Sequence, residues 1–237
     1  MSSDKNAHLI LAAKLAKKHG LTNFVAVCPF EHDLAWSEDD KSFYLKAQEA
    51  EKEALQANPN LTILKPCLTF GPETHLIHYL AQIAIVGRCP YGNLISPSNQ
   101  VEYSPIHTED VATVLAEALT TPKPGSYSVT GQDQMNLRAV MNALERKAGK
   151  AMGSTQAASI PPLDLIWDFF YGTGSDLNMS RMIEFYEKNP SVEADQHANP
   201  WNVHPSIRFE DWVNATTFSE EAYSHPTLTA YRLAHTD

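Results

Sequence analysis

Several reactive and hydrogen-bonding side chains follow directly on an apolar run within residues 61–72. Residues 61–64 are apolar or β-branched and lie between an Asn-Pro-Asn turn and a later Gly-Pro pair, which is typical of a strand buried on both faces of a parallel sheet. Pro66 cannot donate to a strand ladder, so we expect the strand to end near Lys65. Ligands bind at the carboxyl ends of strands in open α/β sheets. Residues 66–72 are therefore the predicted wall of a ligand site, although a strand followed by a plain turn would have the same pattern.

Thiol and metal chemistry are weakly indicated. Cys67 lies in the predicted wall, but Lys65 is the one cation near it in sequence, so we do not expect a reactive thiolate. His75 and His78 are three residues apart on a predicted helix and could share a metal ion, but no carboxylate or cysteine lies at ligand spacing. We interpret them as one exposed and one packed histidine.

Acid–base and nucleophilic sites are also not indicated. His107 stands at a predicted helix start, where we expect it to form a hydrogen bond rather than act as a base. No Gly-X-Ser-X-Gly motif is present. Three acids of one predicted helix are expected to form a solvated face rather than a carboxylate pair: Glu49, Glu51 and Glu53.

The composition limits the class of protein. A chain of 237 residues forms one large domain, or one domain with an appendage, and no apolar run reaches the length of a spanning helix. The formal charge of −10 argues against nucleic-acid binding and weakly against an anionic lipid surface. Three widely spaced cysteines suggest neither a disulfide framework nor a zinc site and fit a reducing compartment. Residues 1–6 resemble neither a secretory signal nor a typical transit peptide.

Hydrophobic periodicity predicts alternating helices and strands up to about residue 150. We expect helices at residues 7–19, 42–57, 74–86, 108–120 and 136–148, and strands at 23–28, 61–65 and 125–131. Gly20 is the expected end signal of the first helix, and Thr108 is the expected N-cap of the fourth. Beyond this point, residues 151–158 are expected to be a linker, 160–171 an aromatic-rich apolar run, 179–188 a helix and 189–237 an aperiodic tail.

The order of these elements resembles the C-terminal half or more of an extended or atypical short-chain dehydrogenase/reductase (SDR). The likeness covers about residues 6–150. Five motifs carry it, in the family's order: residues 20–25 leading into a strand, Tyr44 at a helix start, the Lys-Pro-loop-Phe-Gly-Pro segment at 65–72, Pro-Ile-His-Thr-Glu-Asp-Val-Ala at 105–112, and Gly-Ser-Tyr-Ser-Val-Thr-Gly at 125–131.

The resemblance implies an α/β fold: the C-terminal part of a Rossmann-like, doubly wound parallel sheet without the N-terminal half that carries the family's dinucleotide fingerprint. The implied domains are a partial core at residues 1–150 and an extension at 151–237, with an aromatic docking segment at 160–171 and an irregular tail. The residues that would contact the cofactor, in particular its nicotinamide end, are Tyr44, Lys65, Pro66, Cys67, Leu68 and Thr69.

Two departures from the family's pattern bear on activity. The Gly-X-X-Gly-X-X-Gly motif, which holds the pyrophosphate at a helix N-terminus, does not occur in this sequence. The family's Tyr-X-X-X-Lys pair is also broken, because Gln48 stands four residues after Tyr44. An uncharged glutamine cannot lower the pKa of a tyrosine as the lysine does. We therefore expect no family-type hydride transfer from this chain alone.

The resemblance is closest to the SDR-like accessory subunits of mitochondrial NADH:ubiquinone oxidoreductase (complex I). It implies a non-catalytic subunit on the matrix side of the inner membrane, completed by a partner chain with the N-terminal Rossmann half, and an NADP shared with that partner. Residues 160–171 would make peripheral membrane contact, or would pack on the protein's own core. The alternative is half of a split NAD(P)-dependent epimerase or reductase, and a third reading is a scaffold without nucleotide.

Overall fold

A computed structural model describes six stretches of the chain: residues 5–28, 40–72, 74–89, 102–153, 156–157 and 200–218. The aromatic run at 160–171 and the helix expected at 179–188 lie outside them. The chain divides into two compact units. Unit 1 comprises Met1–Thr69, Ser104–Gln132 and Ser191–Ile207, and unit 2 comprises Phe70–Tyr103, Asp133–Pro190 and Arg208–Asp237.

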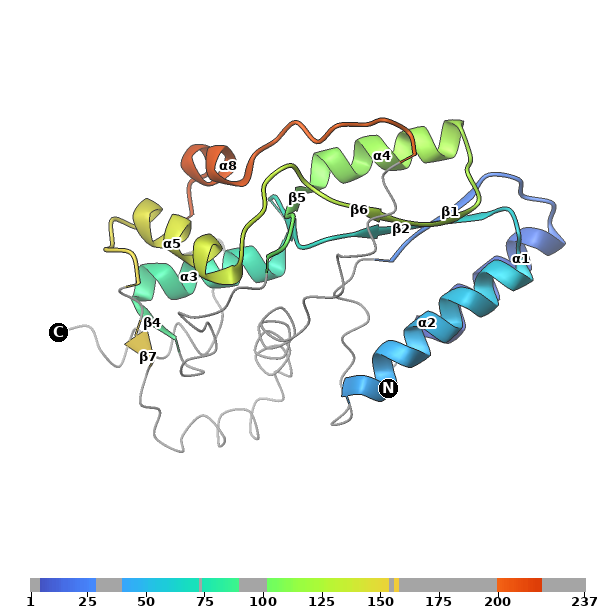
Figure 1. Cartoon of the computed structure of the whole chain (residues 1–237), viewed down its shortest axis with the longest axis horizontal. Helices are drawn as coiled ribbons and strands as arrows, with labels where there is room; N and C mark the ends of the chain where they lie inside the picture. Colours follow the sequence, from blue (N-terminus) through green and yellow to red (C-terminus); the bar gives the residue numbers. More distant parts are fainter. Residues whose placement is uncertain are drawn as a thin grey trace. The chain divides into compact units, whose positions relative to one another are not determined.

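A parallel sheet forms the centre of unit 1 (Figure 1). Its strands are β1 (Phe24–Val27), β2 (Leu61–Pro66) and β6 (Gly125–Val129), and their order is β1-β2-β6. Leu64 is aligned with Val27 on one side and with Tyr127 on the other. The parallel strands joined through helices confirm the predicted α/β class.

Helices cover both faces of this sheet, as Figure 1 shows. The helices α1 (Lys5–Lys18) and α2 (Asp40–Ala57) pack against one face, where Leu61 and Ile63 are fully buried with Ala13 and Ala54. The other face carries α4 (Thr108–Thr120), whose Val114 and Ala118 pack with Leu64. Successive side chains of a strand point to opposite faces, so β2 is buried on both sides, as its apolar run predicted.

The end of α1 follows its predicted signal. Gly20 has a left-handed φ of 67°, its N–H bonds the Lys17 carbonyl, and the N–H of Leu21 bonds the Ala16 carbonyl. These are the two bonds of a Schellman motif, in which glycine takes the positive φ without steric cost. The chain can therefore turn into β1 within a few residues.

The strand β2 ends near Lys65, as predicted: Pro66 is its last residue and is aligned with Val129. The N–H of Cys67 donates to Val129, so the ring nitrogen of Pro66 is directed toward the β1 side. The pairing with β1 ends two residues earlier, where Val27 is aligned with Leu64. A missing N–H therefore costs no ladder bond at this position.

The start of α4 also differs from the prediction. The N-cap is His107, with an extended backbone, and not Thr108. His107 Nδ1 accepts a hydrogen bond from the N–H of Glu109 at 3.2 Å. The expected hydrogen-bonding role of His107 at the helix start is thus confirmed, and Thr108 moves into the first turn.

The C-terminal strap, residues 200–207, runs along unit 1 beside α4 (Figure 1). Buried Asp110 accepts bonds from the N–H and Oγ of Ser206, both at 3.0 Å, and from the N–H of Ile207 at 3.2 Å. At the other end, Trp201 Nε1 donates to the Thr121 carbonyl at 2.7 Å. This part of the aperiodic tail therefore has a fixed path on the core.

Unit 2 contains α3 (His75–Val86), α5 (Leu137–Lys147) and α8 (Phe209–Ala215), with short strands β4 (Arg88–Cys89) and β7 (Gln156–Ala157) paired in parallel. The helix α5 packs against both α3 and α8. The rings of Phe70 and Phe209 meet edge to face at 5.2 Å, and Trp212 lies 5.4 Å from Phe70. The helix α8 was not predicted, because seven residues hold too few turns to show a period.

Polar contacts fix the ends of α5 and α8. The side chain of Asn136 accepts from Ala139 N–H at 2.8 Å and caps α5. Asp133 accepts from Arg208 Nε and from the N–H of Phe209, at the start of α8. The hydrogen bond to Asp133 and the negative charge of this carboxylate raise the pKa of Arg208. No helix in the described ranges is long and apolar enough to cross a membrane.

Candidate functional site

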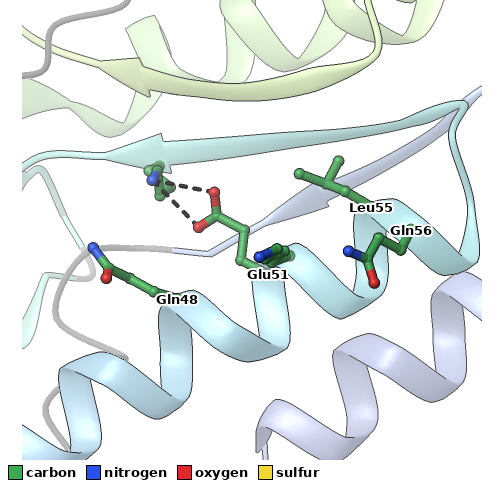
Figure 2. A pocket seen from close by; sticks show the side chains of 6 residues that line it. Gln48, Glu51, Leu55 and Gln56 are labelled. Atoms are coloured by element: carbon green, nitrogen blue, oxygen red, sulfur yellow. Dashed lines mark hydrogen bonds and ion pairs between the residues drawn. The ribbon is translucent and has the colours of Figure 1, made fainter.

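A groove of about 480 Å³ lies between α2 and β2 in unit 1 (Figure 2). Five of its lining side chains come from successive turns of α2 and the sixth from β2: Gln48, Glu51, Lys52, Leu55, Gln56 and Lys65. Residues three, four and seven apart share one face of a helix, so one stripe of α2 supplies most of this wall. The groove opens on the α1/α2 face of the sheet.

An ion pair holds the β2 side of the groove. Lys65 Nζ lies 3.4 and 3.3 Å from the two carboxylate oxygens of Glu51, drawn as dashed lines in Figure 2. Both side chains are mostly buried, at 25% and 21% exposed, so solvent screens the pair less than a surface pair. Glu51 was expected on a solvated face, and that expectation was wrong for this residue. Glu51 is three residues after Gln48, which also lines the groove, and this helical spacing was the signal in the sequence for its place there.

The predicted ligand wall follows Lys65 along the chain. Pro66 and Cys67 are buried, and Cys67 N–H bonds the Val129 carbonyl at 2.9 Å. Leu68 is fully buried and its carbonyl accepts from Ile106 N–H at 2.9 Å. Thr69 is partly buried at the start of β3 (Thr69–Phe70). These contacts hold the wall in place, but the groove is not lined by it. Of the predicted cofactor contacts from Lys65 to Thr69, Lys65 alone lines the groove.

The predicted tyrosine lies in the first turns of α2, and Gln48 follows one helical turn later. The side chain of Tyr44 lies outside the described residues. Gln48 is exposed and lines the groove. In the described part of the groove, two cations are present, Lys52 and Lys65, and Lys65 is already paired with Glu51.

The described side chains of the groove offer polar contacts to a ligand, and none of these six is arranged with another as a catalytic pair. Its two amides donate and accept, its lysines offer N–H donors to anions, and Leu55 provides an apolar floor. Elsewhere, His78 Nε2 lies 3.0 Å from the Gly71 carbonyl, and its ring packs on Trp212 and Phe218. The described residues contain no group of three side chains suited to hold a metal ion.

Comparison with known proteins shows likeness at the level of structure. No protein-family model matches this sequence, and no curated protein matches it. A dTDP-glucose 4,6-dehydratase from Streptomyces venezuelae, DesIV, solved with NAD bound, has a TM-score of 0.54 at 15% identity; the match covers 89% of this chain and 65% of DesIV. The fold is SDR-like and Rossmann-like, in part. The identity is too low to carry over activity.

Two further structures have weaker scores. WbmF from Bordetella bronchiseptica, solved with NAD+ and UDP, has a TM-score of 0.49 at 14% identity over 93% of this chain and 64% of WbmF. A dTDP-4-dehydrorhamnose reductase from Clostridium acetobutylicum has a TM-score of 0.47 at 14% identity over 63% of this chain and 54% of the reductase. The chain thus spans between about half and two thirds of these proteins.

The residues present do not form a complete dinucleotide site. A pyrophosphate is held by a glycine-rich turn at a helix N-terminus, and the sequence has no Gly-X-X-Gly-X-X-Gly motif. Gln48 stands four residues after Tyr44, where the family that the sequence resembles has a lysine, and the neighbouring cation Lys65 is paired with Glu51. We therefore derive no chemical step through a nicotinamide cofactor on this chain alone.

Proposed function

We propose that this chain is one half of a split NAD(P)-dependent epimerase or reductase of the SDR type, completed by a partner chain that carries the glycine-rich motif. The observation that carries the proposal is the edge of the parallel sheet at β1. In the described ranges β1 pairs with β2 alone. An SDR-like fold at this position continues with further parallel strands, and the match to a NAD-bound structure covers 65% of that protein.

The unpaired edge needs a partner for physical reasons. Cys28 N–H donates to Leu64, and backbone N–H groups alternate between the two edges of a strand, so Val25 and Val27 present theirs to the open side. Val27 is also 39% exposed. An apolar edge with free N–H and C=O groups pairs readily with another strand. A parallel strand of the partner would satisfy these groups and extend the sheet.

A second candidate is a non-catalytic role, which the chemistry of the groove favours. Gln48 offers no charge to a tyrosine, and Glu51 occupies Lys65. In this role the chain holds a nucleotide together with its partner, or holds no nucleotide. It serves as an accessory subunit of complex I at the inner mitochondrial membrane. Support for that host complex comes from the sequence resemblance alone.

The test is to tag the protein in its native cell, purify it in mild detergent and identify what co-purifies. The first proposal predicts a stoichiometric partner with a Gly-X-X-Gly-X-X-Gly motif and cofactor turnover by the pair, lost in Tyr44→Phe. Turnover that survives Tyr44→Phe would exclude the family mechanism. Recovery of complex I subunits without turnover would support the accessory role.

The split-fold proposal has a direct contrary outcome. If the chain purified alone is monomeric, soluble and unfolds cooperatively, then the β1 edge needs no partner and the proposal is wrong. Light scattering coupled to size-exclusion chromatography gives the mass, and urea unfolding gives the cooperativity.

A further inference from the structure

The chain turns back over the end of α5 in unit 2, through residues 149–153, which we call the α5 turn. Gly149 has a left-handed φ of 71°, and its N–H donates to the Arg146 carbonyl at 3.0 Å. The buried carboxylate of Glu145 accepts a hydrogen bond from the N–H of Gly153 at 2.6 Å. The backbone of the turn is therefore attached to the last residues of the helix at both of its ends.

Met152 is the exposed thioether of this turn, and its sulfur contacts a cation. Its residue surface is 60% exposed, and Arg146 Nη1 donates a hydrogen bond to Met152 Sδ at 3.1 Å. The Nη2 of the same guanidinium donates to Glu210 of α8 at 2.8 Å. A guanidinium carries five N–H donors, so both contacts can exist at once. Arg146 thus links the α5 turn to α8 through the sulfur of Met152.

Exposure distinguishes Met152 from the other methionines of the described ranges. Met135 and Met141 are buried in unit 2. Oxidation to the sulfoxide makes a methionine side chain polar, which disrupts packing where the residue lies in a core. Met152 can gain the oxygen without losing core packing, so the folded chain can pass between the two forms.

The contact with Arg146 favours the oxidised form of Met152. A thioether sulfur is a weak hydrogen-bond acceptor, whereas a sulfoxide presents a polar oxygen. A hydrogen bond between a charged donor and an oxygen is among the stronger ones in proteins. The N–H of Arg146 that now meets the sulfur could bond the sulfoxide oxygen instead, and the α5 turn would be held more firmly to Arg146.

We propose that Met152 is a peroxide-responsive modification site whose sulfoxide is bound by Arg146. A sulfur lone pair attacks one oxygen of hydrogen peroxide, the S–O bond forms and the O–O bond breaks. The departing hydroxide takes the proton of the transferred oxygen and leaves as water, so sulfur loses two electrons and peroxide gains them. A methionine sulfoxide reductase reverses the step with electrons from thiols. This proposal does not depend on the proposed function.

The first test is the rate of oxidation by hydrogen peroxide in the full chain, purified with any partner that co-purifies. Mass spectrometry of proteolytic peptides gives the rate at each methionine. We expect Met152 to be oxidised at least about tenfold faster than Met135 and Met141, because oxidation follows exposure. Equal rates at Met152 and Met141 would overturn the proposal.

The second test separates a bound sulfoxide from an oxidation that is merely exposed. Hydrogen exchange at the N–H of Gly153 reports opening of the α5 turn, since this N–H bonds Glu145. Oxidised parent should exchange this amide about fivefold more slowly than reduced parent, through the gain of about one hydrogen bond, and sulfoxide reductase should restore the faster rate. An unchanged or faster rate after oxidation would show that Arg146 does not hold the sulfoxide.

Two variants and a matched control make the result specific. In Arg146→Gln, oxidation of Met152 should leave the exchange at Gly153 unchanged, and in Met152→Leu, peroxide should have no effect on it. Glutamine is a good helix former and Arg146 is about half exposed, so α5 should persist, which circular dichroism checks. Lys147→Gln is the control, because Lys147 is the adjacent cation and donates to the Asn214 carbonyl; it should respond like the parent. Parent-like slowing in Arg146→Gln or in Met152→Leu, or its loss in Lys147→Gln, would contradict the proposal.

Discussion

Asp110 is the residue whose loss should release the C-terminal strap from unit 1. Its buried carboxylate accepts three hydrogen bonds, two from Ser206 and one from Ile207, at 3.0 to 3.2 Å. A hydrogen bond to a charged group contributes about 1.5–3 kcal/mol, and three that share one carboxylate do not add. We therefore expect Asp110→Ala to cost about 3 kcal/mol of local stability, which is about 150-fold in the opening equilibrium.

Amide hydrogen exchange measures this opening directly, because the N–H groups of Ser206 and Ile207 are two of the three donors. Asp110→Asn should reduce the free energy of protection of these two amides by roughly half, because one acceptor oxygen remains while the new NH₂ group faces a hydrogen-bond donor. Glu109→Gln is the control, because Glu109 is an acid in the same first turn of α4 but bonds no strap residue. The helix dipole stabilises an acid at this position by about 0.3–1 kcal/mol, so this substitution measures the dipole contribution alone. Parent-like exchange at both amides in Asp110→Ala would refute the reasoning.

Three further substitutions have definite expected outcomes. Gly131→Ala should cost at least about 2 kcal/mol of stability in thermal unfolding, because its Cβ would lie 1.7 Å from the Pro105 carbonyl oxygen. Gly149→Ala has open space around the new Cβ but a φ of 71°, and should cost about 1 kcal/mol. Equal losses of stability in the two variants would contradict this reasoning. Asn136→Ala should cost about 1 kcal/mol in urea unfolding through the lost cap of α5, and no loss would show that the cap is not used. Gln48→Lys should raise the affinity of the assembled protein for NAD(P) about tenfold by calorimetry, and unchanged affinity would separate the groove from the cofactor site.

Local patterns in the sequence predicted much of the fold. The helices α1, α2, α3, α4 and α5 lie within a few residues of their expected bounds, because periodicity and end signals such as Gly20 act over short distances. The buried strand β2 was predicted from its apolar run. Its parallel pairing with β6 confirmed the fold class that the resemblance implied.

Features that depend on distant partners were not predictable. Asp110 bonds residues 96 and 97 positions away, and nothing local in the sequence marks that pairing. Glu51 was assigned to solvent because the position of Lys65 opposite α2 depends on the packed sheet. The cap at His107 was missed because histidine caps helices less often than threonine. Periodicity describes one element, whereas these contacts join two.

The central claim is that a partner strand pairs with β1, and hydrogen exchange at the N–H groups of Val25 and Val27 tests it most directly. The measurement compares the chain alone with its purified native complex. The account predicts fast exchange of both amides in the chain alone and protection of at least about 100-fold in the complex, while Ala26, on the β2 side, changes much less. Equal exchange of Val25 and Val27 in the two samples would contradict a sheet completed at β1.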